Sequence, residues 1–334
     1  MSRPTSRRIG WLVAGTVLLL LALLLSLAIG SRPIPPGEVL DALLGGGTSD
    51  NAHVVRSLRI PRTVIGVLVG IALAVAGAVM QGITRNPIAE PGILGVSQGA
   101  SLGVVCAIAF AGVHSLSGYV WFGFAGAALA GVTVYLLAGS GRDGATPIKL
   151  ALAGAAMNAF LASVVSGIVT TNAQALEGFR FWQVGSLSGR GGDIAQGIWP
   201  FLLAGVLIVA TAARGLDALA LGEDIAKGLG HNTASIRLLG AMGATVLTGA
   251  AVAAAGPIAF TGLAVPHIAR ALVGTAHRWL LPMAALLGPV MILVSDVIGR
   301  ILFPPSEVPV AVMTALLGVP FLVVLVRRKA VVAA

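Results

Sequence analysis

Asp296 and Arg300 stand four residues apart within a long apolar stretch of the sequence, at about 279–301. Residues at this spacing lie on the same face of a helix, so a helical stretch would bring the two charges together. Ionisable groups in apolar surroundings are costly, and they either pair with one another or line an ion pathway. The spacing therefore predicts either a structural salt bridge or a proton relay at Asp296.

His267 is a second polar side chain in an apolar stretch, in the sequence PHIAR. It has no second metal ligand close to it, and the zinc-protease motif HExxH does not occur. We therefore expect a polar helix end packed among other helices, with neither a metal site nor an enzyme. The nucleotide-binding motif GxxxxGK[ST] is also missing from the sequence. If this protein is an active transporter, ATP and Mg²⁺ are bound by another chain, and no cofactor is expected in this one.

The composition places these groups in a membrane. Hydrophobic residues make up 57% of the 334 residues and charged residues only 10%, and the mean hydropathy is +0.98. Soluble domains carry about 25% charged residues, so too few are present here to cover a globular surface. The apolar runs are long and rich in Leu, Ala, Val and Gly, which predicts an all-α integral protein of the lipid bilayer rather than a β-barrel. The basic residues are scattered, which excludes nucleic acid as a partner.

Ten stretches are long and apolar enough to cross a bilayer, which takes about 17–25 residues in a helix. The gaps between them are short, so residues 1–334 are expected to form a single transmembrane domain. The first stretch is expected to be a retained span and not a signal peptide. The expected spans are 11–30, 63–83, 93–112, 118–138, 148–171, 194–213, 236–255, 258–274, 279–301 and 309–326.

The basic residues are unevenly divided between the two sides. With the N-terminus in the cytoplasm, 14 of the 21 Lys and Arg residues fall inside, in agreement with the positive-inside rule. Both termini are therefore expected to be cytoplasmic, in a multi-pass protein of the cytoplasmic (inner) membrane. Arg56, Arg59 and Arg62 run against this trend on the outer side. They predict either a docking surface for acidic groups or a solvated helix start.

The segment 216–230, LDALALGEDIAKGLG, lies on the cytoplasmic side between the sixth and seventh spans. Leu219, Leu221, Ile225 and Leu229 form a partial apolar face, and the segment is too short to span a membrane. This pattern predicts one or two short amphipathic helices. They either lie on the lipid surface or bind the chain that supplies energy.

The segment RNPIAEPGILG, residues 85–95, interrupts two apolar runs. Pro87 and Pro91 lack a backbone donor and bias the residue before each of them away from helical angles. Such a bare backbone is tolerated where water can reach it. We therefore expect a rigid, non-helical turn on the cytoplasmic side between the second and third spans.

Several of these stretches together resemble one family, the permease subunits of ABC importers for ferric siderophores, haem and cobalamin (the FecCD-type family). The resemblance extends in order over nearly the whole chain. It is carried by 59–101, which includes RIPRT and RNPIAEPGILG, by FWQVGSL at 181–187, by 219–230, by GPIAFTGLAVPHIARALVG at 256–274, and by 277–320. It implies a type II ABC importer permease fold of about ten helices. It also implies a dimer around a central path, two cytoplasmic ATP-binding subunits and an extracytoplasmic substrate-binding protein.

The resemblance assigns roles to single residues. It implies docking of the binding protein at Arg59, Arg62 and Arg300. It implies a cytoplasmic gate at Asn86, Ile88, Thr146 and Pro147. It implies coupling to the ATPase at Leu219, Leu221, Gly222, Glu223, Ala226, Leu229 and Gly230. Two positions depart from the family pattern: Ala311 replaces a glycine, and Pro147 replaces a small polar residue.

The stretches FRFWQVGSL, GPIAFTGL and HRWLLP look closest to permeases for ferric catecholate siderophores such as enterobactin. The resemblance therefore implies an importer subunit for iron uptake that has no ATPase motif of its own. It favours a heterodimer with a second permease subunit over a homodimer. A haem or cobalamin importer of the same family is the alternative. An alternative from another class is a self-sufficient ion-coupled secondary transporter that uses Asp296 and His267.

Overall fold

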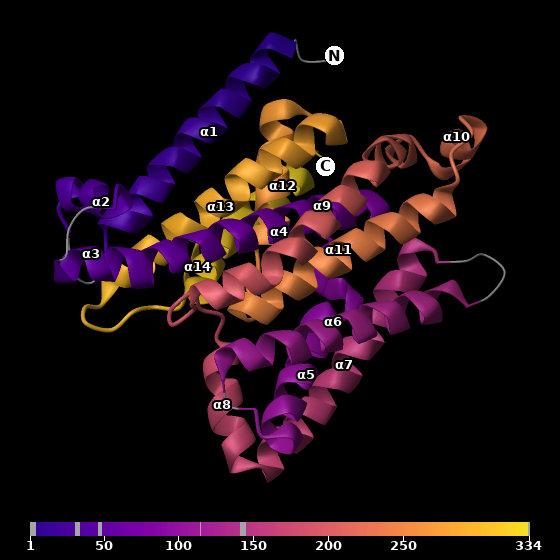
Figure 1. The fold of residues 1–334 in the computed structure, drawn as a ribbon. Coiled ribbons are helices and arrows are strands. Elements are labelled where there is room, and N and C mark those ends of the chain that lie inside the picture. Colours follow the sequence, from indigo (N-terminus) through magenta and orange to yellow (C-terminus); the bar gives the residue numbers. More distant parts are fainter. Residues whose placement is uncertain (1–4, 31–33, 46–48, 114, 141–144, 333–334) are drawn as a thin grey trace.

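The computed structural model describes residues 5–30, 34–45, 49–113, 115–140 and 145–332. These residues form one helical bundle (Figure 1). Its ten longer helices are α1 (Thr5–Ala28), α4 (Ile60–Thr84), α5 (Val96–Ala111), α6 (Leu116–Gly139), α7 (Pro147–Thr171), α9 (Gly192–Ala220), α11 (Thr233–Ala255), α12 (Thr261–Val273), α13 (His277–Leu302) and α14 (Val310–Val332). The shorter segments are α2 (Pro36–Leu43), α3 (Asp50–Val54), the π-helical turn η1 (Val55–Arg59), the 3₁₀ turn η2 (Pro91–Leu94), α8 (Ala173–Gln183) and α10 (Glu223–Gly228).

The ten longer helices correspond one to one to the ten predicted spans, which confirms the all-α membrane fold. Within the described residues, seven helices are long and apolar enough to cross a bilayer. α12 has 13 residues and extends about 20 Å, which is shorter than the hydrocarbon core of about 30 Å. The predicted spans 93–112 and 258–274 begin too early, because 91–94 form a separate turn and 256–260 are non-helical.

Polar side chains directly before several of these helices cap their first turns. An oxygen of each capping residue accepts a hydrogen bond from a backbone N–H of the first turn, which would otherwise lack a partner. The caps are Ser115 for α6, Thr146 for α7, Asn172 for α8 and Asn232 for α11. These capping side chains therefore help to set where the four helices begin.

α4 and α11 lie at the centre of the bundle. In the most apolar 18-residue stretch of each, 78% and 72% of the residues are buried, against 17% in α1 and in α7. α4 packs against α9, α11, α12 and α13, whereas α5 to α8 form a neighbouring group (Figure 1). The remaining apolar faces of α1 and α7 point outward, where lipid or another membrane protein can cover them.

The start of α1 and the end of α14 lie at the same end of the bundle as α10, and α2 and α3 lie at the opposite end (Figure 1). This arrangement agrees with the expectation that both termini and the segment 216–230 are cytoplasmic. We therefore call the end with α10 the inner end and the end with α2 and α3 the outer end.

Glycines let α4 touch two neighbours backbone to backbone. A Cβ atom built on Gly77 would lie 1.9 Å from the carbonyl oxygen of Gly262 in α12. A Cβ on Gly288 of α13 would lie 2.1 Å from the oxygen of Gly70. Small residues permit such close approach in membranes, where apolar lipid provides little hydrophobic drive for helices to associate.

Gly77→Ala is expected to lower the midpoint of thermal unfolding, because the added methyl group overlaps the Gly262 carbonyl and forces α4 and α12 apart. Overpacking of this kind costs about 1–3 kcal/mol. The midpoint is measured on the purified chain in detergent at a fixed heating rate. Gly167→Ala in α7 is the matched control, since a Cβ there meets no atom within 4 Å. Equal midpoints for the two variants would contradict the close packing.

Candidate functional site

Asp296 is the centre of an ion network at the outer end of the bundle. Its side chain is 1% exposed, and Arg62 Nη2 lies 2.7 Å from its Oδ1. Arg300 Nε donates to its Oδ2 at 3.0 Å. Guanidinium groups from α4 and α13 thus occupy both carboxylate oxygens. Of the two sequence-based interpretations of Asp296, the geometry supports the structural salt bridge.

The same end of the bundle holds the last turn of α1. Arg300 Nη1 donates to the Ser26 oxygen at 2.8 Å, and Arg59 Nη1 donates to the oxygens of Leu27 and Ala28 at 2.7 Å each. Carbonyl groups at a helix C-terminus lack intrahelical donors and carry partial negative charge. The two arginines therefore satisfy the end of α1 and fix it against α4 and α13.

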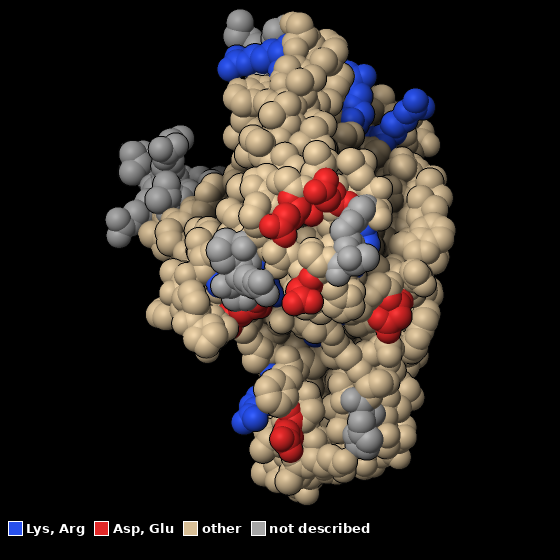
Figure 2. All heavy atoms as spheres, turned by 60° about the vertical axis from the view of Figure 1, so that its left-hand side comes forward, with Lys and Arg blue, Asp and Glu red and all other residues tan. Residues whose placement is uncertain are grey.

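The structure brings the three predicted docking residues, Arg59, Arg62 and Arg300, to one cavity of about 430 Å³. Arg59 is 6% exposed and Arg300 2%, while Arg62 also holds Glu307, Nη1 to Oε2, at 2.7 Å. Figure 2 shows acidic side chains scattered over the surface at this end. The arginines thus lie in a recess, and their role in docking stays a prediction.

A fourth arginine lines this cavity, and the sequence reasoning missed it. Arg190 lies in the glycine-rich loop between α8 and α9 and is 5% exposed. Its Nε donates to the Ser186 oxygen at 3.2 Å, but its buried Nη1 has no hydrogen-bond partner. Burial lowers the pKa of the Arg190 guanidinium to about 10. A lone arginine among glycines gave no spacing signal that would have singled it out.

The segment 85–95 turns at the inner end and then re-enters the bundle. Arg85 has a left-handed backbone with φ +51°, and the Asn86 side-chain oxygen accepts the Ile88 N–H at 3.0 Å. Ile88 is 56% exposed. Farther on, Pro91 packs against Gly262, beside the middle of α4. Arg85, Asn86 and Ile88 are exposed, as expected for a turn that water can reach, whereas Ala89 and Leu94 are buried.

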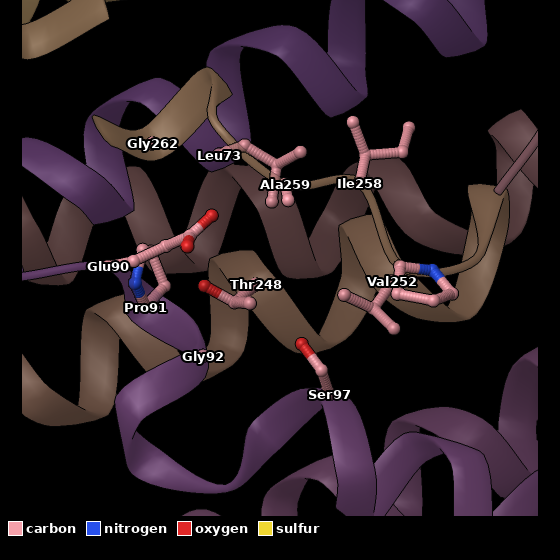
Figure 3. A pocket seen from close by; sticks show the side chains of 11 residues that line it. Leu73, Glu90, Pro91, Gly92, Ser97, Thr248, Val252, Ile258, Ala259 and Gly262 are labelled. Atoms are coloured by element: carbon pink, nitrogen blue, oxygen red, sulfur yellow. The ribbon is translucent and has the colours of Figure 1, made fainter. Parts of the chain in front are cut away.

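This re-entrant segment places Glu90 inside the bundle. Glu90 Oε1 accepts a hydrogen bond from the Phe260 N–H at 3.1 Å, directly before α12. A carboxylate is stabilised at the positive N-terminal end of a helix. Figure 3 shows Glu90, Ser97 and Thr248 around a cavity of about 160 Å³. The sequence reasoning missed Glu90 because span assignment placed residues 84–92 between two spans, in water.

Ser97 belongs to the sequence GVSQG, which fits the hydrolase pattern GxSxG. In a hydrolase a base such as histidine would stand beside this serine. The residues that line its cavity include no histidine, and in the described part of the chain His267 is engaged within its own helix, Nδ1 to the Leu263 oxygen at 3.0 Å. His267 also meets the ring of Phe321 edge to face. The geometry thus fits the expected packed helix end.

The other predicted gate residues, Thr146 and Pro147, begin α7. The Thr146 hydroxyl accepts the Lys149 N–H at 3.4 Å, and Pro147 occupies the first helical position, where its missing N–H is tolerated. Contact between α7 and the re-entrant segment lies farther along the helix, where Asn158 Nδ2 donates to the Gly92 oxygen at 3.1 Å. The gate role of Asn86, Ile88, Thr146 and Pro147 stays a prediction.

The predicted coupling segment has one buried and one exposed side. Leu219 and Ala226 are buried, whereas Leu221, Ile225 and Leu229 are 62%, 53% and 62% exposed. These three residues, four apart in sequence, form what we call the exposed coupling face. The backbone needs Gly222 and Gly230, which have φ angles of +122° and +81° and separate α10 from its neighbours.

Glu223 anchors α10 to α11. Its Oε2 lies 2.6 Å from Arg237 Nη2, and its Oε1 lies 3.2 Å from Lys227 Nζ. Hydrogen bonds from Arg237 and Lys227 lower the pKa of Glu223, so the carboxylate stays charged at neutral pH. Ile225 of the exposed coupling face is therefore carried on a helix whose orientation is fixed by ion pairs, and Leu221 and Leu229 flank this helix.

Comparisons with known proteins agree with this arrangement. The model of the FecCD transport family matches residues 18–328. The ferric enterobactin transport system permease protein FepD of Escherichia coli (strain K12) is 43% identical over 94% of this chain and 93% of its own length. The Fe(3+)-citrate import system permease protein YfmD of Bacillus subtilis (strain 168) is 40% identical, over 98% of this chain and 97% of its own length.

Among solved structures, one described as an inward-facing conformation of a metal-chelate type ABC transporter superposes with a TM-score of 0.81. It is 30% identical in sequence, and the match covers 95% of this chain and 98% of the other. The sequence and structural matches both extend over the outer arginine network, the re-entrant segment and the coupling segment. This chain belongs to the FecCD transport family.

Proposed function

We propose that this chain is the transmembrane permease subunit of an ATP-driven ABC importer that moves a ferric siderophore across the cytoplasmic membrane. The related proteins are permease components of iron-import systems by their names. The chain has no nucleotide-binding motif, so ATP is hydrolysed by partner subunits. The interpretation as a self-sufficient secondary transporter is not favoured, since two guanidinium groups hold the Asp296 carboxylate.

The observation that carries this proposal is the exposed coupling face. Three large apolar side chains, Leu221, Ile225 and Leu229, extend from the inner end of the protein. Apolar residues grouped on an exposed surface mark an interaction site, and the Glu223 ion pairs hold this one in place. A helix that fits a groove on another protein is a common recognition mode. We assign the groove to a cytoplasmic ATP-binding subunit, with two such subunits in each importer.

The cargo is inferred as a chemical class. One related permease serves ferric enterobactin and another ferric citrate, so the shared cargo is iron held in a small organic chelator. A ferric siderophore satisfies this description. Haem and cobalamin are the alternative cargoes, and the transport experiment below distinguishes them from a ferric siderophore.

We assign the remaining partners and the gate from the residues at the two ends of the bundle. A second, similar permease subunit packs beside this chain, and we favour a heterodimer. An extracytoplasmic substrate-binding protein docks at the outer recess that holds Arg59, Arg62 and Arg300. At the inner end, the exposed turn with Asn86 and Ile88 and the start of α7 with Thr146 and Pro147 close the path toward the cytoplasm.

Reconstitution into vesicles tests the proposed function. Vesicles that contain this chain, its second permease and its ATPase should take up ⁵⁵Fe-labelled siderophore when binding protein is outside and ATP inside. Uptake of haem or cobalamin instead would replace the cargo assignment. Uptake by vesicles that hold this chain alone, driven by a proton or sodium gradient, would overturn the importer proposal.

The coupling face is tested in the same vesicles. The combined variant Leu221→Ser, Ile225→Ser and Leu229→Ser should reduce ATP-driven uptake at least about tenfold, because hot-spot side chains at interfaces each contribute about 2 kcal/mol or more. Leu44→Ser is the matched control, since Leu44 is 77% exposed but follows α2 at the outer end. Full uptake and a full stimulated ATPase rate in the triple variant would refute the coupling role.

Crosslinking tests the gate. Asn86→Cys in a Cys106→Ser background, paired with a cysteine at the equivalent position of the second permease, should form a disulfide across the path. Oxidation is expected to block ATP-driven uptake, and reduction should restore it. A matched pair at Gly167, which is exposed in α7, controls for the chemical treatment. Undiminished uptake by fully linked importer would show that the turn does not gate the path.

A further inference from the structure

A polar cavity of about 620 Å³ lies at the inner end of the bundle and is lined by residues of α6, α10 and the start of α11. Its charged lining residues are Glu223, Lys227 and Arg237. Glu223 holds both basic residues, but two positive charges against one carboxylate leave a net charge of +1 on the lining. Basic hollows at the cytoplasmic ends of membrane helices suit anionic lipid headgroups. A phosphodiester group with one negative charge would balance this cavity.

Donors in this cavity are accessible to a headgroup. The Lys227 side chain is 58% exposed, although its Nζ lies 3.2 Å from Glu223 Oε1. An ammonium group has three N–H donors, so Lys227 can hold a phosphate oxygen as well. Thr233 and Ala234 also line the cavity, in the first turn of α11. Backbone N–H groups in a first turn have no intrahelical acceptor, and they attract anions.

An apolar groove of about 300 Å³ continues from this cavity, and Tyr135 lines both hollows. The groove lies between α6 and α11, which pack side by side (Figure 1). Its lining residues fall within 128–136 of α6 and 238–246 of α11, a length of about 12 Å at the rise of an α-helix. Half of the hydrocarbon core of a bilayer is about 15 Å thick. The groove is therefore about as long as the acyl layer of one leaflet.

The order of these parts singles out this groove among the apolar faces of the protein. Val132, Leu136 and Met242 are exposed along it, but exposed apolar side chains alone meet lipid anywhere on a membrane protein. Here charge lies at the inner end, a tyrosine follows, and the apolar groove extends from there toward the middle of the bundle. A phospholipid of the inner leaflet has the same order of headgroup, interface and acyl chain, and tyrosine is enriched at that interface.

We propose that α6, α10 and α11 bind one anionic phospholipid of the inner leaflet. Its phosphate lies against Lys227 and the first turn of α11, and one acyl chain occupies the groove that begins at Tyr135. The site depends on the inner end facing the cytoplasm and on no assignment of cargo or ATPase. Because Lys227 belongs to α10, the bound lipid also contacts the helix that carries Ile225 of the exposed coupling face.

Native mass spectrometry of the purified full chain in detergent tests the headgroup site. Dioleoyl-phosphatidylglycerol is expected to bind with a Kd about fivefold lower than that of dioleoyl-phosphatidylcholine, which has the same acyl chains, because one basic residue contributes about this factor to binding of an anionic lipid. Lys227→Gln should abolish this preference. Arg278→Gln is the matched control, since Arg278 is exposed at the same end and does not line the cavity. It should keep the preference.

The groove is tested with the same lipid. Val132→Trp is expected to raise the Kd of phosphatidylglycerol at least about tenfold, because the indole fills the groove and two lost methylene contacts already correspond to this factor. Leu129→Trp is the matched control, since Leu129 is exposed on the same helix but does not line the groove. Soluble glycerol 3-phosphate at the same concentration as the lipid should not compete, because it has no acyl chain.

The comparison of the two lipids on the wild-type chain is independent of any effect of a substitution on folding. The proposal is wrong if both lipids bind equally, or if folded Lys227→Gln or Val132→Trp protein binds as the wild type does. Competition by glycerol 3-phosphate would instead indicate a site for free phosphate. A structure of the complete importer in phosphatidylglycerol nanodiscs should show the lipid in the groove, and a helix of the second permease there would also overturn the proposal. None of these outcomes decides the proposed function, which the uptake experiment tests.

Discussion

The contact of one buried carboxylate with two guanidinium groups organises the outer end of this protein. Asp296 alone would be costly to bury, and so would Arg62 or Arg300, but together they offset much of that desolvation. Because Arg300 also holds the end of α1, the network joins α1, α4 and α13 at one point. This arrangement determines the shape of the outer recess and gives the recess an excess of positive charge.

Much of the fold could be predicted from the sequence, because hydropathy and charge bias directly reflect the bilayer. The coupling segment could also be predicted, since its apolar spacing and its glycines define a short helix. The sequence could not show where a span is broken when the broken part is itself apolar, as in GPIAF before α12. Nor could it locate Arg190 or Glu90, whose importance depends on neighbours from distant parts of the chain.

The breaks in the third and eighth spans are related to each other. η2 precedes α5, and an irregular segment precedes α12, and the two meet where Glu90 accepts the Phe260 N–H. Non-helical backbone at membrane depth is tolerated when protein groups satisfy it. Asn158 of α7 likewise satisfies non-helical backbone, because its side chain donates to the Gly92 oxygen in η2. The middle of the bundle therefore contains two helix beginnings held by polar side chains from other segments.

The glycine contacts of α4 restrict how this bundle can change shape. Side chains between two helices can change rotamer and let the helices slide, but two backbones in direct contact have nothing to rearrange. A displacement of α4 by part of a turn along α12 or α13 would drive a Cβ atom into a carbonyl group at Gly262 or Gly70. These three helices therefore behave mechanically as one block.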